Sequence, residues 1–211
     1  MEPLSEVEAR VVACLVEKQR TVPDTYPLSL NSLVTACNQT SNRDPILHLE
    51  DGDIVRAIDS LKARGMARIV HPGSGSRATK YRHVLDEALG LDDGELSVLT
   101  VLLLRGAQTA AELRSRTERL HPFAALGEVE DALARLAARP EPMTLRLERR
   151  PGEREARWIP LLTPSGHGDS PEARETVTRT AGGDVEARVT ALEGEVAELR
   201  AVVEQLRELL D

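Results

Sequence analysis

Apolar residues near the start of the chain recur at the three- and four-residue spacing of amphipathic helices. Ser5 with Glu8 forms a capping box, and the apolar stripe that follows predicts a helix to about Gln19. Ser29 is the expected cap of a second helix, whose stripe ends at Cys37. Prolines between the two stripes stop the first helix, so the pattern predicts two separate helices.

A third helix is predicted to begin at Glu50 or Asp51 and to end at Gly65, where a left-handed cap is favoured. The stripe assigned to its buried face comprises Ile54, Val55, Ile58 and Leu61. Two strand-like runs, 66–70 and 78–84, follow around a glycine- and serine-rich segment and predict a hairpin. The order is therefore helix, helix, helix, hairpin.

The same order recurs in the following part of the chain. Asp92 with Glu95 repeats the first capping box, and Thr109 opens another capped helix before a third apolar stripe. Alternation over residues 143–148 predicts a strand, and a turn at Pro151-Gly152 leads it to residues 156–159, so a second hairpin is predicted. Two copies with matching caps and stripes indicate an internal repeat.

This order is typical of the winged helix-turn-helix plan, so the predicted fold is mostly α with small β-hairpins (α+β). We expect tandem winged helix-turn-helix domains at residues 1–88 and 89–162. The first copy departs from the plan because the loop at residues 38–49 replaces the usual link of about three or four residues. The second copy keeps a short link at residues 121–124. A pair of three-helix domains without a DNA function is the alternative.

The end of the chain has a different character. Residues 163–183 are rich in Pro, Gly, Ser, Thr and charge, which predicts a flexible linker. Residues 184–211 predict a C-terminal coiled-coil helix, because valine at a with leucine at d favours parallel two-stranded coils. The positions assigned to this dimer seam are Val189, Leu192, Val196, Leu199, Val203 and Leu206. A homodimer is therefore expected, and a helix folded back onto the domains is the alternative.

Charge is distributed unevenly along the chain. Residues 1–90 carry 11 basic and 12 acidic side chains, and residues 91–162 carry the same numbers. Residues 163–211 carry 5 basic and 11 acidic side chains, so most of the net charge of −8 belongs to the tail. The acidic balance of the whole chain is therefore weak evidence against nucleic-acid binding by the predicted domains.

The clearest basic segment is the first predicted hairpin with the end of the helix before it. Residues 60–85 contain no acid and six basic side chains. Arg68, Lys80 and Arg82 are expected on one face of the hairpin, with Arg77 near its tip. Such a hairpin can lie along a phosphate backbone, and a solvated surface face is the alternative. The second hairpin interleaves arginines with glutamates, which favours cross-strand ion pairs over a phosphate track.

Both third helices begin with carboxylates, which favour a helix N-terminus and repel phosphate. The acidic positions are Glu50, Asp51, Asp53, Glu128, Glu130 and Asp131. Specific major-groove reading by either helix is therefore unfavourable. Asn42 and Arg43, in the loop before the first of these helices, are candidate polar contacts to DNA. The alternative is that Asn42 and Asp44 hydrogen-bond the backbone of their own loop.

Three stretches are long and specific: LSLNSL at 28–33, CNQTSNRDP at 37–45, and LRGAQT at 104–109 with ELR at 112–114. In these stretches the chain from Leu4 to Leu162 resembles the YceH-like family of uncharacterised bacterial proteins. The resemblance implies a tandem winged-helix fold and no established activity. The coiled-coil tail lies outside the motifs that carry it.

Catalytic and metal-binding patterns are missing from the sequence. It has no P-loop, GxSxG or HExxH motif, and its five histidines share no ligand spacing. Cys14 and Cys37 lie on apolar helix faces and read as reduced core thiols. The start of the chain lacks a signal-peptide pattern, and the apolar run 96–104 is too short to cross a bilayer. We expect a cytoplasmic protein without cofactor, metal or membrane association.

These observations predict a non-enzymatic cytoplasmic adaptor or regulator that contacts the DNA backbone through its first wing. The expected partners are double-stranded DNA, a second copy of the chain and a protein partner. The alternative is a protein-interaction scaffold with no DNA binding. It is akin to the acidic tandem winged-helix subunits of chromosome-organising complexes, an analogy that rests on fold alone.

Overall fold

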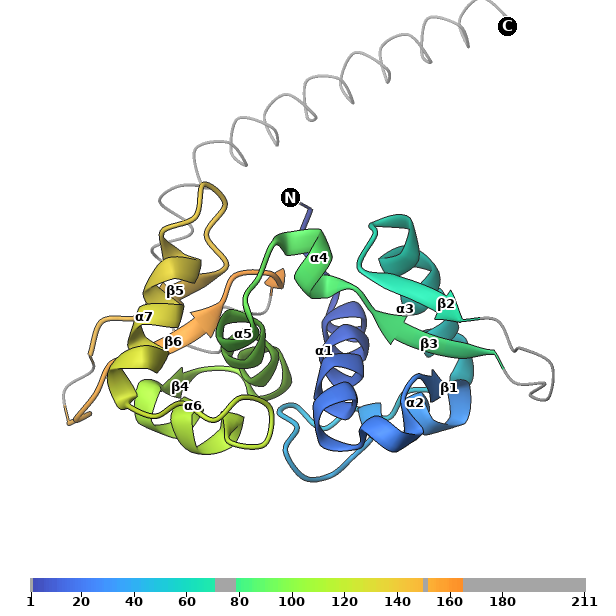
Figure 1. Cartoon of the computed structure of the whole chain (residues 1–211), viewed down its shortest axis with the longest axis horizontal. Coiled ribbons are helices and arrows are strands. Elements are labelled where there is room, and N and C mark those ends of the chain that lie inside the picture. Colours follow the sequence, from blue (N-terminus) through green and yellow to red (C-terminus); the bar gives the residue numbers. More distant parts are fainter. Residues whose placement is uncertain (1, 71–78, 150–151, 165–211) are drawn as a thin grey trace, which may run out of the picture. The chain divides into compact units, whose positions relative to one another are not determined.

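The computed structural model describes residues 2–70, 79–149 and 152–164, all within one compact unit, Met1–Gly168 (Figure 1). The predicted linker beyond residue 164, the coiled-coil seam and Arg77 lie outside the described residues. The fold is mixed, with helices and small antiparallel sheets, as the α+β prediction required. Among the described residues, no helix combines the length and apolarity needed to cross a membrane.

Two similar series of elements follow one another along the chain. We call them repeat 1 and repeat 2. Repeat 1 consists of α1 (Glu6–Thr21), η1 (Pro23–Thr25), β1 (Leu28–Ser29), α2 (Leu30–Cys37), α3 (Asp51–Ala63), β2 (Ala67–Val70) and β3 (Lys80–His83). A short helix, α4 (Leu85–Leu89), leads into repeat 2. Repeat 2 consists of α5 (Asp93–Arg105), β4 (Gln108–Thr109), α6 (Ala110–Thr117), α7 (Leu126–Ala137), β5 (Thr144–Arg146) and β6 (Arg157–Pro160).

The helix ends follow the predicted local chemistry. The capping boxes that begin α1, α5 and α6 are all present, with both reciprocal hydrogen bonds in each. Gly65 has a φ of 71°, and the N–H of Met66 donates to the carbonyl of Leu61 at 2.8 Å. A side chain with a Cβ is strained in that left-handed conformation, so the predicted glycine cap of α3 is confirmed.

Each repeat contains a three-stranded antiparallel sheet, in the order β1-β3-β2 and β4-β6-β5. The hairpins were predicted, whereas the two-residue strands β1 and β4 were not, because so short a segment shows no alternation. The two hairpins have the same pairing register. In the first hairpin the N–H of Val84 donates to the carbonyl of Met66 at 2.9 Å, and in the second the N–H of Leu161 donates to the carbonyl of Met143 at 2.8 Å. Positions of the two hairpins can therefore be compared one by one.

The repeats share a continuous apolar core. Helices α1 and α5 pack against each other in the middle of the unit (Figure 1). Every residue of α5 from Gly94 to Leu104 is buried, which explains why this helix is largely apolar around its circumference. The backbone N–H of Leu4 also donates to the carbonyl of Leu162 at 2.7 Å, so the two ends of the unit are joined. The structure thus combines the two predicted domains into one unit.

The prediction of a buried side chain was wrong for one residue of α3. Ile54 is fully buried, but Val55 beside it is 39% exposed. Ile54, Ile58 and Leu61 are spaced as i, i+4 and i+7 and define the buried face of α3. Val55 lies about 100° around the helix from Ile54, which turns it toward solvent. The outer face of α3 therefore carries an apolar side chain.

Candidate nucleic-acid interface

The first hairpin places its basic side chains on one face, as alternation predicted. Arg68 stands opposite Arg82, and Lys80 stands opposite Val70. Directly opposite residues in an antiparallel pair share a face of the sheet, so Arg68, Lys80 and Arg82 point the same way. The other face carries His83, which is buried at 2% exposure. The basic face is therefore the outer face of the hairpin.

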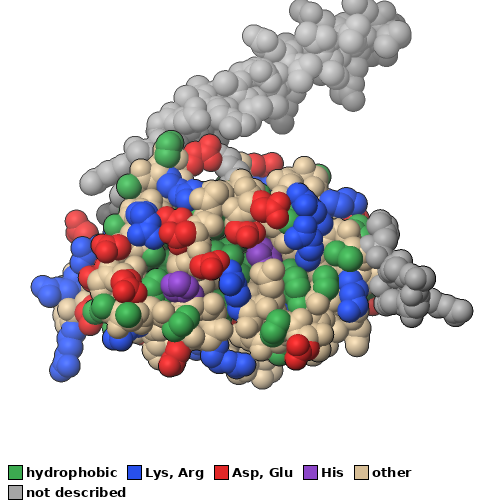
Figure 2. Space-filling model, viewed as in Figure 1, with side chains coloured by type: hydrophobic (Ala, Val, Ile, Leu, Met, Phe, Trp, Pro, Cys, Tyr) green, Lys and Arg blue, Asp and Glu red, His purple; other side chains and the backbone are tan. Residues whose placement is uncertain are grey.

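The ion pairs on this outer face are few. Arg68 contacts Glu87 of α4 at 3.2 Å, and both side chains are more than half exposed, so the pair is weak. Within the described residues, Lys80 and Arg82 form no ion pair. Two like charges opposite each other, as Arg68 and Arg82 are, repel unless an anion lies between them. In Figure 2, Lys and Arg side chains lie over the β2–β3 hairpin, close to acidic side chains over α4.

The third helix of repeat 1 offers no comparable surface. Arg56 pairs with Asp53 of the same helix at 2.6 Å, and Lys62 lies 3.4 Å from Asp59. The basic side chains of α3 thus lie beside its own carboxylates, and Asp51 remains exposed at its start. Among the described residues, the start of α3 therefore presents carboxylates, and its one basic side chain there is paired.

Arg43 does not lie on an exposed surface. Its side chain is fully buried and binds both carboxylate oxygens of Glu17, at 3.1 and 2.7 Å. It also donates to the carbonyl of Ala36 and to the side chain of Gln39. Burial raises the pKa of Glu17, but the hydrogen bonds and charge of Arg43 outweigh it, and the net pKa is lowered. The guanidinium of Arg43 is buried and bound within the unit, which contradicts the prediction that it contacts DNA.

Arg10 and Arg43 together hold the C-terminal end of α2. Arg10 is 2% exposed and donates to the carbonyls of Cys37 and Pro45, at 3.2 and 2.6 Å. The Cys14 thiol donates to Ala36 at 3.4 Å. Guanidinium groups stabilise the negative end of a helix dipole and its unpaired carbonyls. The specific motif at 37–45 therefore anchors the long loop of repeat 1.

Asn42 joins this loop to repeat 2. It has a positive φ of 60°, and its side-chain oxygen accepts from Arg105 at 3.0 Å. The backbone N–H of Asp44 donates to the carbonyl of Leu104 at 2.8 Å. Asn42 also accepts a hydrogen bond from Arg43 through its backbone carbonyl. Its contacts are therefore structural, although the residue itself is exposed.

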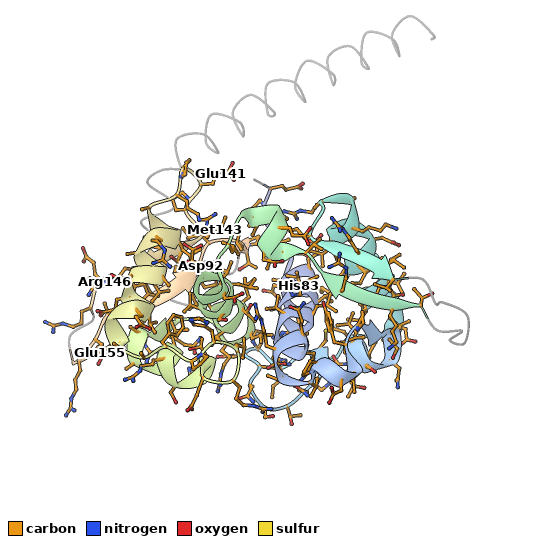
Figure 3. The ribbon with its side chains drawn as sticks, viewed as in Figure 1. His83, Asp92, Glu141, Met143, Arg146 and Glu155 are labelled. Carbon is orange, nitrogen blue, oxygen red and sulfur yellow. The ribbon has the colours of Figure 1, made fainter. Side chains whose placement is uncertain are left out.

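His83 fixes the end of the first hairpin to α1 (Figure 3). One ring nitrogen lies 2.5 Å from the side-chain oxygen of Gln19, and the other accepts from the N–H of Leu85 at 3.3 Å. Burial lowers the pKa of His83 to about 4, although Asp86 opposes the shift. The imidazole is neutral at physiological pH and is a structural group. The hydroxyl of Tyr26 accepts from the His83 N–H at 2.8 Å, and burial raises the pKa of Tyr26 to about 12.

The second hairpin forms few ion pairs in the described part of the chain. Arg157 lies 3.5 Å from Glu153, whereas none of Arg146, Glu148, Arg149, Arg154 and Glu155 forms an ion pair there. Arg150, which also belongs to the predicted mixed pattern, lies outside the described residues. In contrast, Arg135 of α7 contacts Asp92 and Glu95, at 2.8 and 3.1 Å. Cys14 and Cys37 are free and buried, as predicted. Across residues 2–70, 79–149 and 152–164, no group of three or more metal-ligating side chains was found.

Comparison with known proteins identifies the family of this chain. The family described as "Protein of unknown function, DUF480" matches residues 4–153. The chain belongs to the DUF480 family. The matched region includes α1 to β5 and therefore most of both repeats.

Relatives of this chain match it over more of its length than the family does. A UPF0502 protein of Geobacter sulfurreducens is 48% identical over 200 residues, covering 93% of this chain and 90% of the relative. The UPF0502 protein YceH of Salmonella paratyphi A is 45% identical over 208 residues, covering 96% and 95%. The YceH-like resemblance is therefore confirmed. Because this match covers 96% of the chain, the similarity also extends into the tail, although the motifs that first indicated the family lie outside the tail.

Proposed function

We propose that this chain is a non-enzymatic adaptor or regulator whose first hairpin contacts the phosphate backbone of duplex DNA. The observation that supports this proposal is that Arg68, Lys80 and Arg82 all point to the outer face of that hairpin. We interpret each repeat as a winged helix-turn-helix domain, because three helices precede a hairpin in both. The β2–β3 hairpin is then the first wing.

The wing is favoured over the third helices by its charge. Among the described residues, the outer face of the wing forms one ion pair, Arg68 with Glu87, which is weak because it is exposed. The start of α3 has carboxylates and no unpaired basic side chain in its first two turns. Backbone contact through a wing positions a protein on DNA without reading its sequence. Sequence preference is therefore expected to be low.

The test is the salt dependence of binding to random duplex DNA. Each neutralised phosphate contributes about −0.9 to the slope of log K against log salt. Replacing Arg68, Lys80 and Arg82 with alanine should therefore reduce the slope by about 2 to 3. A matched control with Arg56, Lys62 and Arg119 replaced removes the same charge away from the wing and should leave most of the slope. Equal slopes for the two variants would contradict the proposal.

A protein-interaction scaffold without DNA binding is the second candidate. The acidic starts of α3 and α7 favour it, because they repel phosphate on the face that such domains usually turn to DNA. Absence of duplex binding by the full chain, even at low salt, would support the scaffold and end the DNA proposal.

We also propose that residues 184–211 join two copies of the chain. Valine at a and leucine at d support a parallel pair, but fewer than about four heptads make an isolated coil marginal. Sedimentation of the full chain should give the mass of a dimer, and a chain cut after Thr180 should give that of a monomer. Equal oligomeric states would show that the tail does not join the copies.

A further inference from the structure

A cleft of about 610 Å³ lies in repeat 2, between the start of α7 and the second hairpin. Leu126 and Glu130, one turn apart, form the helical wall. Trp158 of β6 also lines the cleft and is 8% exposed. Arg146 stands directly opposite Trp158 in the register, so both lie on the face of the hairpin that lines the cleft. A cleft of this volume falls within the size range of ligand sites.

The rim of the cleft carries six exposed charged side chains. They are Arg146, Arg149, Arg154, Glu130, Glu148 and Glu155. No ion pair joins any two of them within the described residues, although both signs line one cleft. Elsewhere in the same repeat, Arg135 and Arg139 both contact Glu95, at 3.1 and 3.0 Å. The rim charges are therefore available to groups outside the chain.

We propose that this cleft binds an extended peptide segment of a partner protein. The segment carries an apolar side chain that packs beside Trp158, with acidic and basic side chains flanking it. Three arginines and three glutamates cancel, so the rim does not attract a polyanion such as single-stranded nucleic acid. A segment with charges of both signs is complementary to the rim, and an apolar side chain is complementary to Trp158, Leu126 and Leu147.

This inference rests on the proposed adaptor role and supplies its protein-binding surface. It does not depend on contact between DNA and the first wing, which is formed by residues of repeat 1. Trp158 is the only tryptophan in the sequence, so its fluorescence reports on this cleft alone.

The test uses the full chain and a phage-displayed library of short random peptides. Enriched peptides should contain an apolar residue flanked by acidic and basic residues. Their synthetic forms should shift the emission of Trp158. Arg154→Glu should weaken binding about tenfold, and exchange of an acidic residue of the peptide for lysine should restore it. Arg119→Glu, at an exposed position that forms no ion pair with the described residues, is the charge-matched control and should have no effect.

The proposal would be overturned if the library yielded no enriched peptides, or if Arg154→Glu and Arg119→Glu weakened peptide binding equally. It would also be overturned if the peptides bound without changing the emission of Trp158. A larger emission shift with a single-stranded oligonucleotide than with the peptides would also overturn it. Duplex binding by Arg154→Glu should equal that of the unmodified chain, so this test and the test of the DNA proposal can fail separately.

Discussion

Repeat 1 and repeat 2 share their caps and their strand register but present different surfaces. Where the first hairpin has Arg68 opposite Arg82, the second has Leu145 opposite Ile159. On the other face, Ile69 opposite Tyr81 is replaced by Arg146 opposite Trp158. Charge therefore lies on the outer face of one hairpin and in the cleft of the other. One backbone plan thus supports two different candidate binding surfaces.

The same comparison shows what the repeats have in common. Glu8, the capping carboxylate of α1, accepts from Ser60 of α3 and lies 3.6 Å from Arg64. Glu95, the capping carboxylate of α5, contacts Arg135 of α7 and Arg139 just after that helix in the corresponding way. In both repeats a capping box thus also ties the first helix to the third. The two repeats therefore share this contact between the first and third helices, whereas their outer surfaces differ.

The largest difference in stability is expected from the loop of repeat 1. Arg43→Ala leaves the carboxylate of Glu17 without its main partner, and loss of one member of a buried pair costs about 3–5 kcal/mol. Arg116→Ala in repeat 2 removes a partly exposed pair with Glu112 and one hydrogen bond to the side-chain oxygen of Gln108, and should cost about 1–2 kcal/mol. Urea unfolding of both variants measures the difference. Similar losses for both would show that the long loop is not anchored through Arg43.

A smaller difference is expected in acid. Because the folded pKa of His83 is about 4, below the value of about 6.5 for an unfolded chain, the unfolded state binds the proton first. Stability from this group is complete above about pH 6.5 and decreases by about 3 kcal/mol as the pH falls to about 4. Repeat 2 has Pro160 at this position, opposite Thr144, and lacks such a group.

The measurement is urea unfolding at several pH values. His83→Asn should be less stable at neutral pH but should lose less stability than the unmodified chain between pH 6.5 and 4. The groups facing His83 are Asp86, Glu87, Arg20 and Arg82, and none of them is changed in this variant. Parallel pH profiles for the two proteins would assign the acid sensitivity to other groups.

The smallest effect concerns the outer face of α3. Val55→Ala should change the free energy of unfolding by less than about 0.5 kcal/mol, because the side chain is partly exposed. Ile54→Ala, one residue earlier, should cost about 2–5 kcal/mol, because Ile54 is fully buried. Glu130→Ala, at the position of α7 that corresponds to Val55, should also be nearly neutral. A large loss for Val55→Ala would mean that the face is covered in solution.

The sequence by itself determined the local structure. Caps, apolar spacing and turn residues predicted the main helices, the glycine end of α3 and both hairpins, because each depends on neighbours within a few residues. Alternation also predicted the shared face of Arg68, Lys80 and Arg82. The same local reasoning missed β1, β4 and α4, which are too short to show a period.

The tertiary structure decided what the polar side chains do. Nothing in the spacing of Arg43 indicated that Glu17 lies beside it, 26 residues earlier in the chain. Nothing in the alternation of the second hairpin indicated that α7 faces it across a cleft. A cap or a turn is set by local backbone geometry, whereas burial and ion pairing depend on contacts between distant segments. Those contacts form only when the helices and sheets pack together.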